Sequence, residues 1–249
     1  EMTPFKFILA ATDFSVPADN AVRRAALLAK QHCARLCIVH VIAAARRVPF
    51  RAWLSPAIGR DLKVADAHDR LQRLAGDLTN RYDVTVDLEV RAGDVVEELH
   101  RASARVDLLV MAQRRRSALA EMVLGSTAQR LVECTRRPVL VVKQAATGAY
   151  RRALVPIDFT PASDAAALVA AALAPDIDLQ IFHAMDSTGE TVMRDVDVSE
   201  SVIRAYRLRE EAALLARMAS SMTRLGLDSG KLHFALGRGS PVTATLRQV

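Results

Sequence analysis

The chain has 249 residues, few aromatic side chains, little cysteine and no long hydrophobic run. Aromatic residues make up 4% of it, but hydrophobic residues as a whole make up 51%, which excludes an intrinsically disordered chain. No apolar run approaches the roughly 18 residues that suggest a membrane span. The pattern of a signal peptide is not visible in residues 1–12. We therefore expect one large globular domain or two small ones.

The three cysteines are too few, and odd in number, for a disulfide-stapled scaffold. Cys33 and Cys37 have the spacing of neither a redox pair nor a zinc pair with a second half, so we expect ordinary buried thiols there. A reducing cytoplasm is the simplest compartment for such a chain, and we expect a cytoplasmic protein.

Signatures of several enzyme classes are also missing. Neither a serine-nucleophile elbow nor a Gly-x4-Gly-Lys-Ser/Thr phosphate loop occurs in the sequence. His68 and Asp69 have no accompanying ligand cluster, so we expect an exposed helix surface there. The segment 237–240 (GRGS) lacks the third glycine of a dinucleotide fingerprint, and we expect a turn and a helix start.

The net charge of +6 is distributed unevenly along the chain. Residues 1–150 hold 23 basic and 16 acidic side chains, whereas residues 151–249 hold 11 and 12. Such an excess can indicate an anionic partner, for example a nucleotide, a nucleic acid or a membrane surface. No basic block is interleaved with aromatic residues, as single-strand binders require, so a solvated surface with arginines at helix ends is the favoured interpretation. We expect neither nucleic acid nor a membrane as the partner.

An internal repeat organises the chain. Residues 7–15 read FILAATDFS and residues 152–160 read RALVPIDFT, two apolar runs that end in Asp-Phe and a hydroxyl residue. The segments LCIVHVI and LQIFHAM follow, each with a histidine at the same place, at His40 and His183. A packed structural role is expected for both histidines. Several matches in one order are hard to explain by chance, so we expect two related units.

Each unit is expected to alternate strands with helices. In the first unit, apolar runs and helical periodicity predict strands at 6–12, 35–42, 84–91, 108–112 and 139–143 and helices at 17–33, 60–81, 94–104 and 126–135. This alternation implies right-handed crossovers and a parallel sheet. The expected fold class is α/β, with two tandem Rossmann-like open parallel sheets that carry helices on both faces.

The expected boundaries are residues 1–143 for domain 1, 144–151 for a small polar linker, and 152–249 for domain 2. Domain 2 has no counterpart of the last two strands of domain 1 or of the helix between them. A sheet that stopped there would have an open edge, so we expect domain 2 to be incomplete at its C-terminal end.

Candidate binding residues lie where the expected strands end. Open parallel sheets bind ligands outside the carboxyl ends of their strands, so Asp13, Val41 and Ala112 should approach one crevice. Residues 125–127 (Gly-Ser-Thr) open a helix, and the free N–H groups, the hydroxyls and the helix dipole there favour an anion. The same three residues are equally consistent with an ordinary helix N-cap. Asp158, the counterpart of Asp13, fits either a ligand contact or a cap of the next helix.

These motifs resemble the universal stress protein family in its tandem two-domain form, over nearly the whole chain. The resemblance rests on residues 13–15 (DFS), 40–42 (HVI), 107–111 (DLLVM), 124–127 (LGST) and 137–142 (RPVLVV). It implies an adenine nucleotide, ATP or AMP, with Mg²⁺ where a triphosphate is bound. The binding positions that it implies are Ala11, Asp13, Val41, Ala112, Arg115, Gly125, Ser126, Thr127 and Asp158. Among them, Asp13 would contact the nucleotide or its metal, Val41 the adenine, and the hydroxyl residues the phosphates; Asp158 is the second possible Mg²⁺ contact.

The chain departs from the family pattern in the phosphate loop. Family members that bind ATP carry Gly-x2-Gly-x9-Gly-Ser/Thr, and here Ala112 and Arg115 replace the first two glycines. Such glycines let the backbone touch phosphate oxygens. Arg115 would block that path, fold outward, or reach back to a phosphate together with Arg114 and Arg116; a solvated basic loop is a further interpretation. Nucleotide binding by domain 1 therefore stays open.

Three functions stay open at this stage. The first is a cytoplasmic stress-response protein that binds an adenine nucleotide as a sensor or regulator, with at most weak ATP hydrolysis. The second is a scaffold of the same family that binds no nucleotide and acts through dimerisation or interaction. The third and least favoured is an ATP-using enzyme of related architecture, because no catalytic cluster is seen. We expect a homodimer or an intrachain pseudo-dimer.

Overall fold

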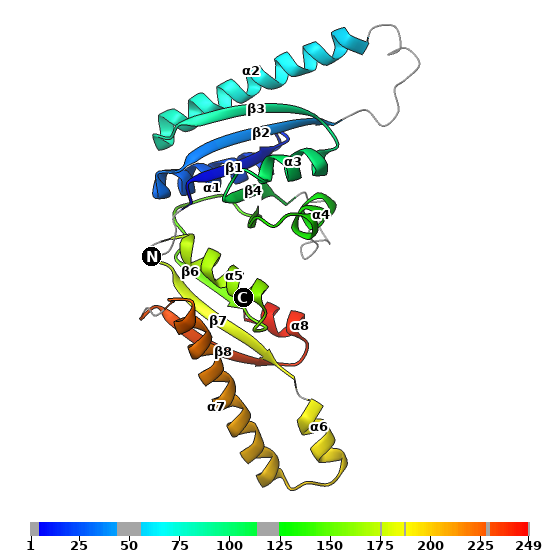
Figure 1. The fold of residues 1–249 in the computed structure, drawn as a ribbon, viewed down its shortest axis with the longest axis vertical. Helices are drawn as coiled ribbons and strands as arrows, with labels where there is room; N and C mark the ends of the chain where they lie inside the picture. Colours follow the sequence, from blue (N-terminus) through cyan, green and yellow to red (C-terminus); the bar gives the residue numbers. More distant parts are fainter. Residues whose placement is uncertain are drawn as a thin grey trace. The chain divides into compact units, whose positions relative to one another are not determined.

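The computed structural model describes residues 5–43, 56–113, 125–174, 176–186, 188–227 and 230–248. The chain divides into two compact units between Ala149 and Tyr150. We call the part before this point the first unit and the part after it the second unit (Figure 1). Among the described residues, no helix is both long enough and apolar enough to cross a membrane.

The first unit is a five-stranded parallel sheet with four described helices. The strand order is β3-β2-β1-β4-β5. The strands are β1 Phe7–Thr12, β2 Arg35–Ala43, β3 Val86–Gly93, β4 Leu108–Ala112 and β5 Val139–Val142. The helices are α1 Val16–His32, α2 Pro56–Tyr82, α3 Val95–Ser103 and α4 Ser126–Cys134. The expected α/β class with a parallel sheet is confirmed.

The element boundaries differ from the predictions by up to four residues. The largest difference at a strand is at β3, which starts at Val86 and not at residue 84. Val84 is buried and fits the alternating pattern, but it follows a turn in which Asp83 has φ of 55°. The Thr79 hydroxyl donates to the Val84 carbonyl at 3.1 Å. The turn therefore holds Val84 in the core before the strand begins.

The central strands are buried on both faces, which is why they read as continuous apolar runs. Ile8, Leu9 and Ala10 of β1 are at most 1% exposed, as is the stretch Leu108–Val110 of β4. Helix α1 contacts β1, β4 and α2, whereas α3 contacts α4. The apolar cluster on the α3 and α4 side takes alternate residues of the sheet, Leu9, Val39 and Leu109.

The strand order places a reversal at the centre of the sheet. From β1 the chain moves through β2 to β3 at one edge, and it then returns to β4 and β5 on the other side of β1. The point between β1 and β4 is therefore the switch point of the sheet, where open α/β folds bind ligands.

The second unit repeats the first part of this arrangement. Its three parallel strands have the order β6-β7-β8, and they are β6 Arg152–Pro156, β7 Asp178–Met185 and β8 Leu232–Arg238. Its helices are α5 Pro161–Ala172, α6 Thr188–Asp195, α7 Glu200–Arg224 and α8 Pro241–Leu246. Helix α6 was not anticipated from the sequence. The core of this unit is aliphatic and includes Val155, Ile181 and Met218.

Candidate functional site

The carboxyl edge of the first sheet gathers most of the predicted binding residues. Ala10 of β1 is paired with Val110 of β4, and each strand ends two residues further on, at Thr12 and Ala112. Asp13 follows β1 directly and is exposed. Because the strands are parallel, these positions and the end of β2 lie at one edge of the sheet.

The apolar part of this edge comes from Ala11 and Val41. Both are half-buried and pack against the cluster on the α3 and α4 side of the sheet. Met111, the residue before Ala112, belongs to that cluster and is 7% exposed. The edge thus has a small, partly exposed apolar surface.

Asp13 lies in a tight turn that fixes its carboxylate. Its Oδ1 accepts hydrogen bonds from the Ser15 backbone N–H at 3.1 Å and from the Ser15 hydroxyl at 2.5 Å. Ser15 is also the N-cap of α1, since its hydroxyl oxygen accepts from the Ala18 N–H at 3.4 Å. The turn therefore links the end of β1 to the start of α1 through the Asp13 side chain.

Helix α4 begins with an uncapped turn. Its N-cap residue is Gly125, and among the described residues no side chain caps the helix. By contrast, the side chains of Ser15, Asp94 and Thr160 cap α1, α3 and α5. Ser126 is exposed and Thr127 half-buried, so their hydroxyls and the first N–H groups of α4 are available to an anion.

Arg115 lies outside the described residues, so its orientation stays a prediction. Gln113, the residue after β4, was not singled out from the sequence. It is 7% exposed, and its N–H donates to the Val142 carbonyl at 3.1 Å, which extends the pairing of β4 with β5. The sequence signal that could have identified it is a polar residue directly after an apolar strand.

Asp158 of the second unit lies in the same kind of turn as Asp13. Its Oδ1 accepts from the Thr160 N–H at 3.0 Å and from the Thr160 hydroxyl at 2.5 Å. The side-chain hydrogen bond from Thr160, followed by the backbone one, lowers the pKa of Asp158 below its ordinary value. The carboxylate is therefore held in its charged form at the edge of the second sheet.

The two strand histidines make the same hydrogen bond in the two units. Nδ1 of His40 donates to the Thr12 carbonyl at 2.8 Å, and Nδ1 of His183 donates to the Ile157 carbonyl at 2.8 Å. Each accepting carbonyl belongs to the residue directly before the turn aspartate. The histidines thus tie the second strand of each unit to the end of the first.

The cysteines differ in their surroundings. Burial, and next the carboxylates of Glu89 and Asp87, raise the pKa of Cys37 to about 11. The expectation of a buried thiol at Cys33 is wrong, because this residue is exposed. It ends α1 in a left-handed conformation with φ of 51°, and its N–H bonds to carbonyls of the last turn.

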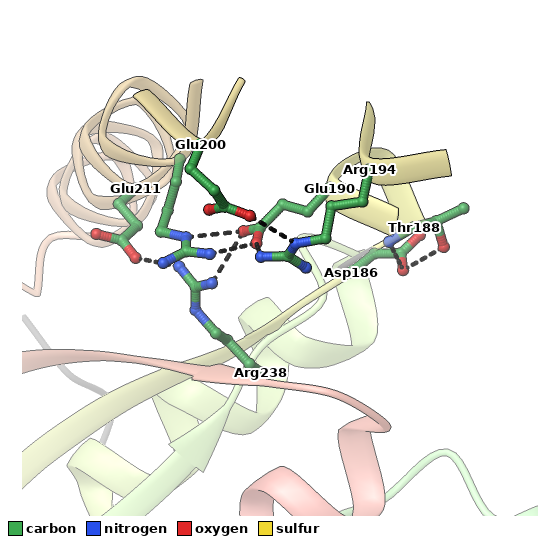
Figure 2. Close-up of polar contacts among 8 residues, drawn as sticks. Asp186, Thr188, Glu190, Arg194, Glu200, Glu211 and Arg238 are labelled. Atoms are coloured by element: carbon green, nitrogen blue, oxygen red, sulfur yellow. Dashed lines mark hydrogen bonds and ion pairs between the residues drawn. The ribbon is translucent and has the colours of Figure 1, made fainter. Parts of the chain in front are cut away.

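The second unit contains a cluster of ion pairs that sequence reasoning missed (Figure 2). Glu190 of α6 is 8% exposed. Its Oε1 accepts from Arg207 Nε at 3.1 Å and from Arg238 Nη1 at 2.9 Å, and its Oε2 accepts from Arg207 Nη2 at 2.6 Å. Arg238 also donates to Glu211 at 2.6 Å, and Arg194 donates to Glu200 at 3.3 Å.

This cluster joins α6 to α7 and to the end of β8. The hydrogen bond from Arg207, followed by the charges of Arg238 and Arg207, lowers the pKa of Glu190 below its ordinary value. The three arginines face three glutamates, so their charge is balanced within the unit. We therefore interpret the cluster as an attachment of α6 and not as an open anion site.

The described part of the chain holds no recognisable metal cluster, and one of its cavities lies away from the predicted residues. No group of three or more His, Cys, Asp or Glu side chains that could hold a metal ion occurs among the described residues. A surface cavity of about 470 Å³ lies next to α1 and the C-terminal part of α2, lined among others by Arg23, Leu78 and Tyr82. None of the predicted binding residues lines it.

The strand order, the aspartate after β1 and the glycine that precedes α4 define a Rossmann-like α/β protein with a ligand edge at the switch point. Comparison with known proteins identifies the group. The model of the universal stress protein family matches residues 4–143, more than half of the chain, and the chain belongs to this family.

Individual relatives are similar at a moderate level. A curated universal stress protein of Mycolicibacterium smegmatis is 32% identical over 165 residues, which cover 64% of this chain and 56% of that protein. The chain thus spans little more than half the length of this relative.

Two solved structures share the fold across both units. A universal stress protein of Archaeoglobus fulgidus has a TM-score of 0.71 and 19% sequence identity. The matched region covers 97% of this chain and 82% of that protein. A putative universal stress protein of Pseudomonas aeruginosa has a TM-score of 0.55 and 17% sequence identity. The matched region covers 94% of this chain and 74% of that protein. At sequence identities this low, the structural similarity shows a shared fold alone.

Proposed function

We propose that this protein is a cytoplasmic stress-response protein that binds an adenine nucleotide, ATP or AMP, as a sensor or regulator. The observation that carries the proposal is the carboxyl edge of the first sheet. There, the Asp13 carboxylate, a small apolar surface and the uncapped start of α4 accompany the switch point of a family fold.

Each part of the edge suits one part of a nucleotide. The adenine would lie against Ala11 and Val41, since a half-buried apolar surface suits a planar base. The Asp13 carboxylate would accept hydrogen bonds from the nucleoside. The N–H groups and hydroxyls of residues 125–127 would hold phosphate oxygens. Ala112 is small enough to allow close approach, and Arg115 would act as a cation toward the phosphates or narrow their path.

The described side chains do not build a cage for a resident metal ion, since no cluster of three ligands occurs among them. Mg²⁺ typically keeps several waters and binds through one or two carboxylates and substrate phosphates. We therefore propose that Mg²⁺ enters with a triphosphate, with Asp13 or Asp158 as its protein contact. Binding is favoured over turnover, because Asp13 is the one carboxylate among the predicted residues at the first edge.

Strand β5 ends the described sheet of the first unit and offers backbone groups for pairing with a second copy. We propose a homodimer on this ground, with an intrachain pseudo-dimer of the two units as the alternative. Light scattering on the eluting protein would give the mass of the assembly.

Calorimetric titration of the full chain with ATP and with AMP tests the nucleotide proposal. We expect Asp13→Ala to weaken binding by about tenfold or more, since a hydrogen-bonded charge is lost from the site. Val132→Ala, on the exposed side of α4, is the matched control and should leave the affinity unchanged. Asp158→Ala reports whether the second unit contributes a site.

Absorbance near 260 nm gives an independent check, because one Trp and three Tyr give the chain little absorbance of its own near 280 nm. Purified protein with neither bound nucleotide nor a heat of binding would refute the nucleotide proposal and leave the scaffold function. ATP turnover that one carboxylate variant abolishes would instead favour the enzyme.

A further inference from the structure

Each aspartate turn contains a phenylalanine in an unusual backbone conformation. Phe14 has φ of 60° and Phe159 has φ of 62°. A positive φ is uncommon for a residue with a Cβ atom and is strained for a bulky one, so the surrounding structure must hold it. In both units this residue directly follows the aspartate whose carboxylate lies at the ligand edge.

Two partners hold each phenylalanine ring. The ring of Phe14 contacts the imidazole of His40 at 4.5 Å between centroids, and the guanidinium carbon of Arg70 lies 4.1 Å from the ring centroid. In the second unit, Phe159 contacts His183 at 4.9 Å and Arg217 at 3.9 Å. We call each set of histidine, phenylalanine and arginine a ring clamp.

The clamp is connected to the strand end as well as to the turn. The same imidazole that contacts the ring donates from Nδ1 to the carbonyl of Thr12 or Ile157, the residue before the aspartate. The aspartate therefore lies between a tethered carbonyl and a clamped ring. Its Oδ1 then accepts from the hydroxyl residue after the ring, at 2.5 Å in both units.

The arginines extend the internal repeat into the helices. Arg70 of α2 and Arg217 of α7 each precede a fully buried residue, Leu71 and Met218, at 0% exposure. Helices α2 and α7 have few other matching residues. Even so, each places an arginine guanidinium over the phenylalanine ring, at nearly the same distance from the ring centroid. A contact that is present twice, from different helix sequences, points to a requirement of the turn.

We propose that Phe14 and Phe159 are positioning residues, whose clamped rings hold the Asp13 and Asp158 carboxylates at the two sheet edges before a ligand arrives. The effect of this role on ligand binding rests on the proposed nucleotide function, whereas the positioning of the carboxylates does not. It also implies that the second unit keeps a prepared aspartate and takes a ligand of the same class. Preorganisation of this kind raises affinity, because the ordering of the turn no longer opposes binding.

A ligand-free titration tests the positioning directly. Carbon NMR of the Asp158 carboxyl group in the full chain should show its pKa rising toward the ordinary value of about 3.9 in Phe159→Leu. Thr160→Val, which removes the donating hydroxyl, is the positive control, and Val196→Ala, on an exposed site of the same unit, is the negative control. A folded Phe159→Leu variant with an unchanged Asp158 pKa would overturn the proposal.

A double-mutant cycle tests the consequence for ligand binding. Phe14→Leu should weaken ATP binding about tenfold in the wild-type background and less than about twofold in the Asp13→Asn background, since it acts through that carboxylate. Val16→Ala, 76% exposed at the start of α1, should change neither affinity nor thermal midpoint. Equal losses in both backgrounds would contradict positioning.

The two experiments separate the two claims. If the wild-type chain binds no ATP, the nucleotide function fails, while the Asp158 titration still decides whether the clamp positions the carboxylate. If ATP binds and the titration shows no shift, the clamp fails and the nucleotide function stands.

Discussion

At the scale of single residues, the fold depends on close approaches that only particular side chains allow. Gly237 of β8 is the sharpest case. A Cβ atom at this position would lie 2.4 Å from Cζ of Phe182, whose ring is 1% exposed in the core of the second unit. The ring has no room to withdraw, because interiors are close-packed.

We therefore predict that Gly237→Ala destabilises the second unit by about 1–3 kcal/mol, the range for overpacking a core. Denaturant unfolding would measure the change. Gly230→Ala is the control, since nothing lies within 4 Å of a Cβ atom there. Equal stability of the two variants would show that Phe182 can move aside.

Cysteine reactivity is the second property decided at this scale. A pKa of about 11 leaves about one Cys37 thiol in a thousand ionised at pH 8, whereas Cys33 and Cys134 are exposed. We predict that iodoacetamide at pH 8 modifies Cys33 and Cys134 well before Cys37, as peptide mass spectrometry would measure. Unfolding the chain first should remove the difference; if it persists in the unfolded chain, burial is not its cause.

At the scale of elements, helix α6 is attached through one buried carboxylate. Glu190 connects it to Arg207 of α7 and Arg238 of β8, and these contacts lower its pKa (Figure 2). A group with a lowered pKa in the folded state stabilises that state above its unfolded pKa, about 4.5 for this carboxyl. That contribution is lost as the pH falls through the lowered value.

We predict that α6 exchanges its amide hydrogens more slowly at pH 7 in the wild type than in Glu190→Gln. This difference should disappear as the medium is acidified through the lowered pKa of Glu190. Glu200→Gln is the control, because this side chain is 69% exposed and pairs with Arg194, which is itself half exposed. The same protection of α6 in wild type and Glu190→Gln at pH 7 would mean that apolar packing attaches the helix.

At the scale of the whole molecule, the first unit has its own five-stranded sheet and its own core. Its strands pair among themselves, and buried Arg24 of α1 donates to the Gly148 carbonyl at 2.5 Å, within the same unit. These contacts include the residues that precede the division at Ala149.

We predict that residues 4–149 fold alone, with a cooperative thermal transition and the circular dichroism of an α/β domain. A fragment that stops at residue 143 should be less stable, since it lacks the carbonyl that Arg24 binds. If the longer fragment is unfolded in isolation, the boundary proposed between the two domains is wrong.

Much of the fold could be predicted from the sequence. Continuous apolar runs predicted β1 and β4, helical periodicity predicted α1 and α3, and the repeated Asp-Phe turns indicated two related units. These signals are local, since they depend on which face of an element is buried. The same signals predict that Asp13, Val41 and residues 125–127 lie near one edge, because parallel strands end together.

Other features were decided by tertiary structure alone. Each ring clamp joins a turn, a strand and a helix that lie up to 58 residues apart, from Phe159 to Arg217 in the second unit, and no spacing in the chain marks the arginine. The Glu190 cluster depends in the same way on the meeting of α6, α7 and β8. The sequence by itself determined the order of the elements and their buried faces, because these follow from local periodicity. Only the packing of distant elements determined which charges and rings meet around the two aspartates, because such contacts depend on distances in space.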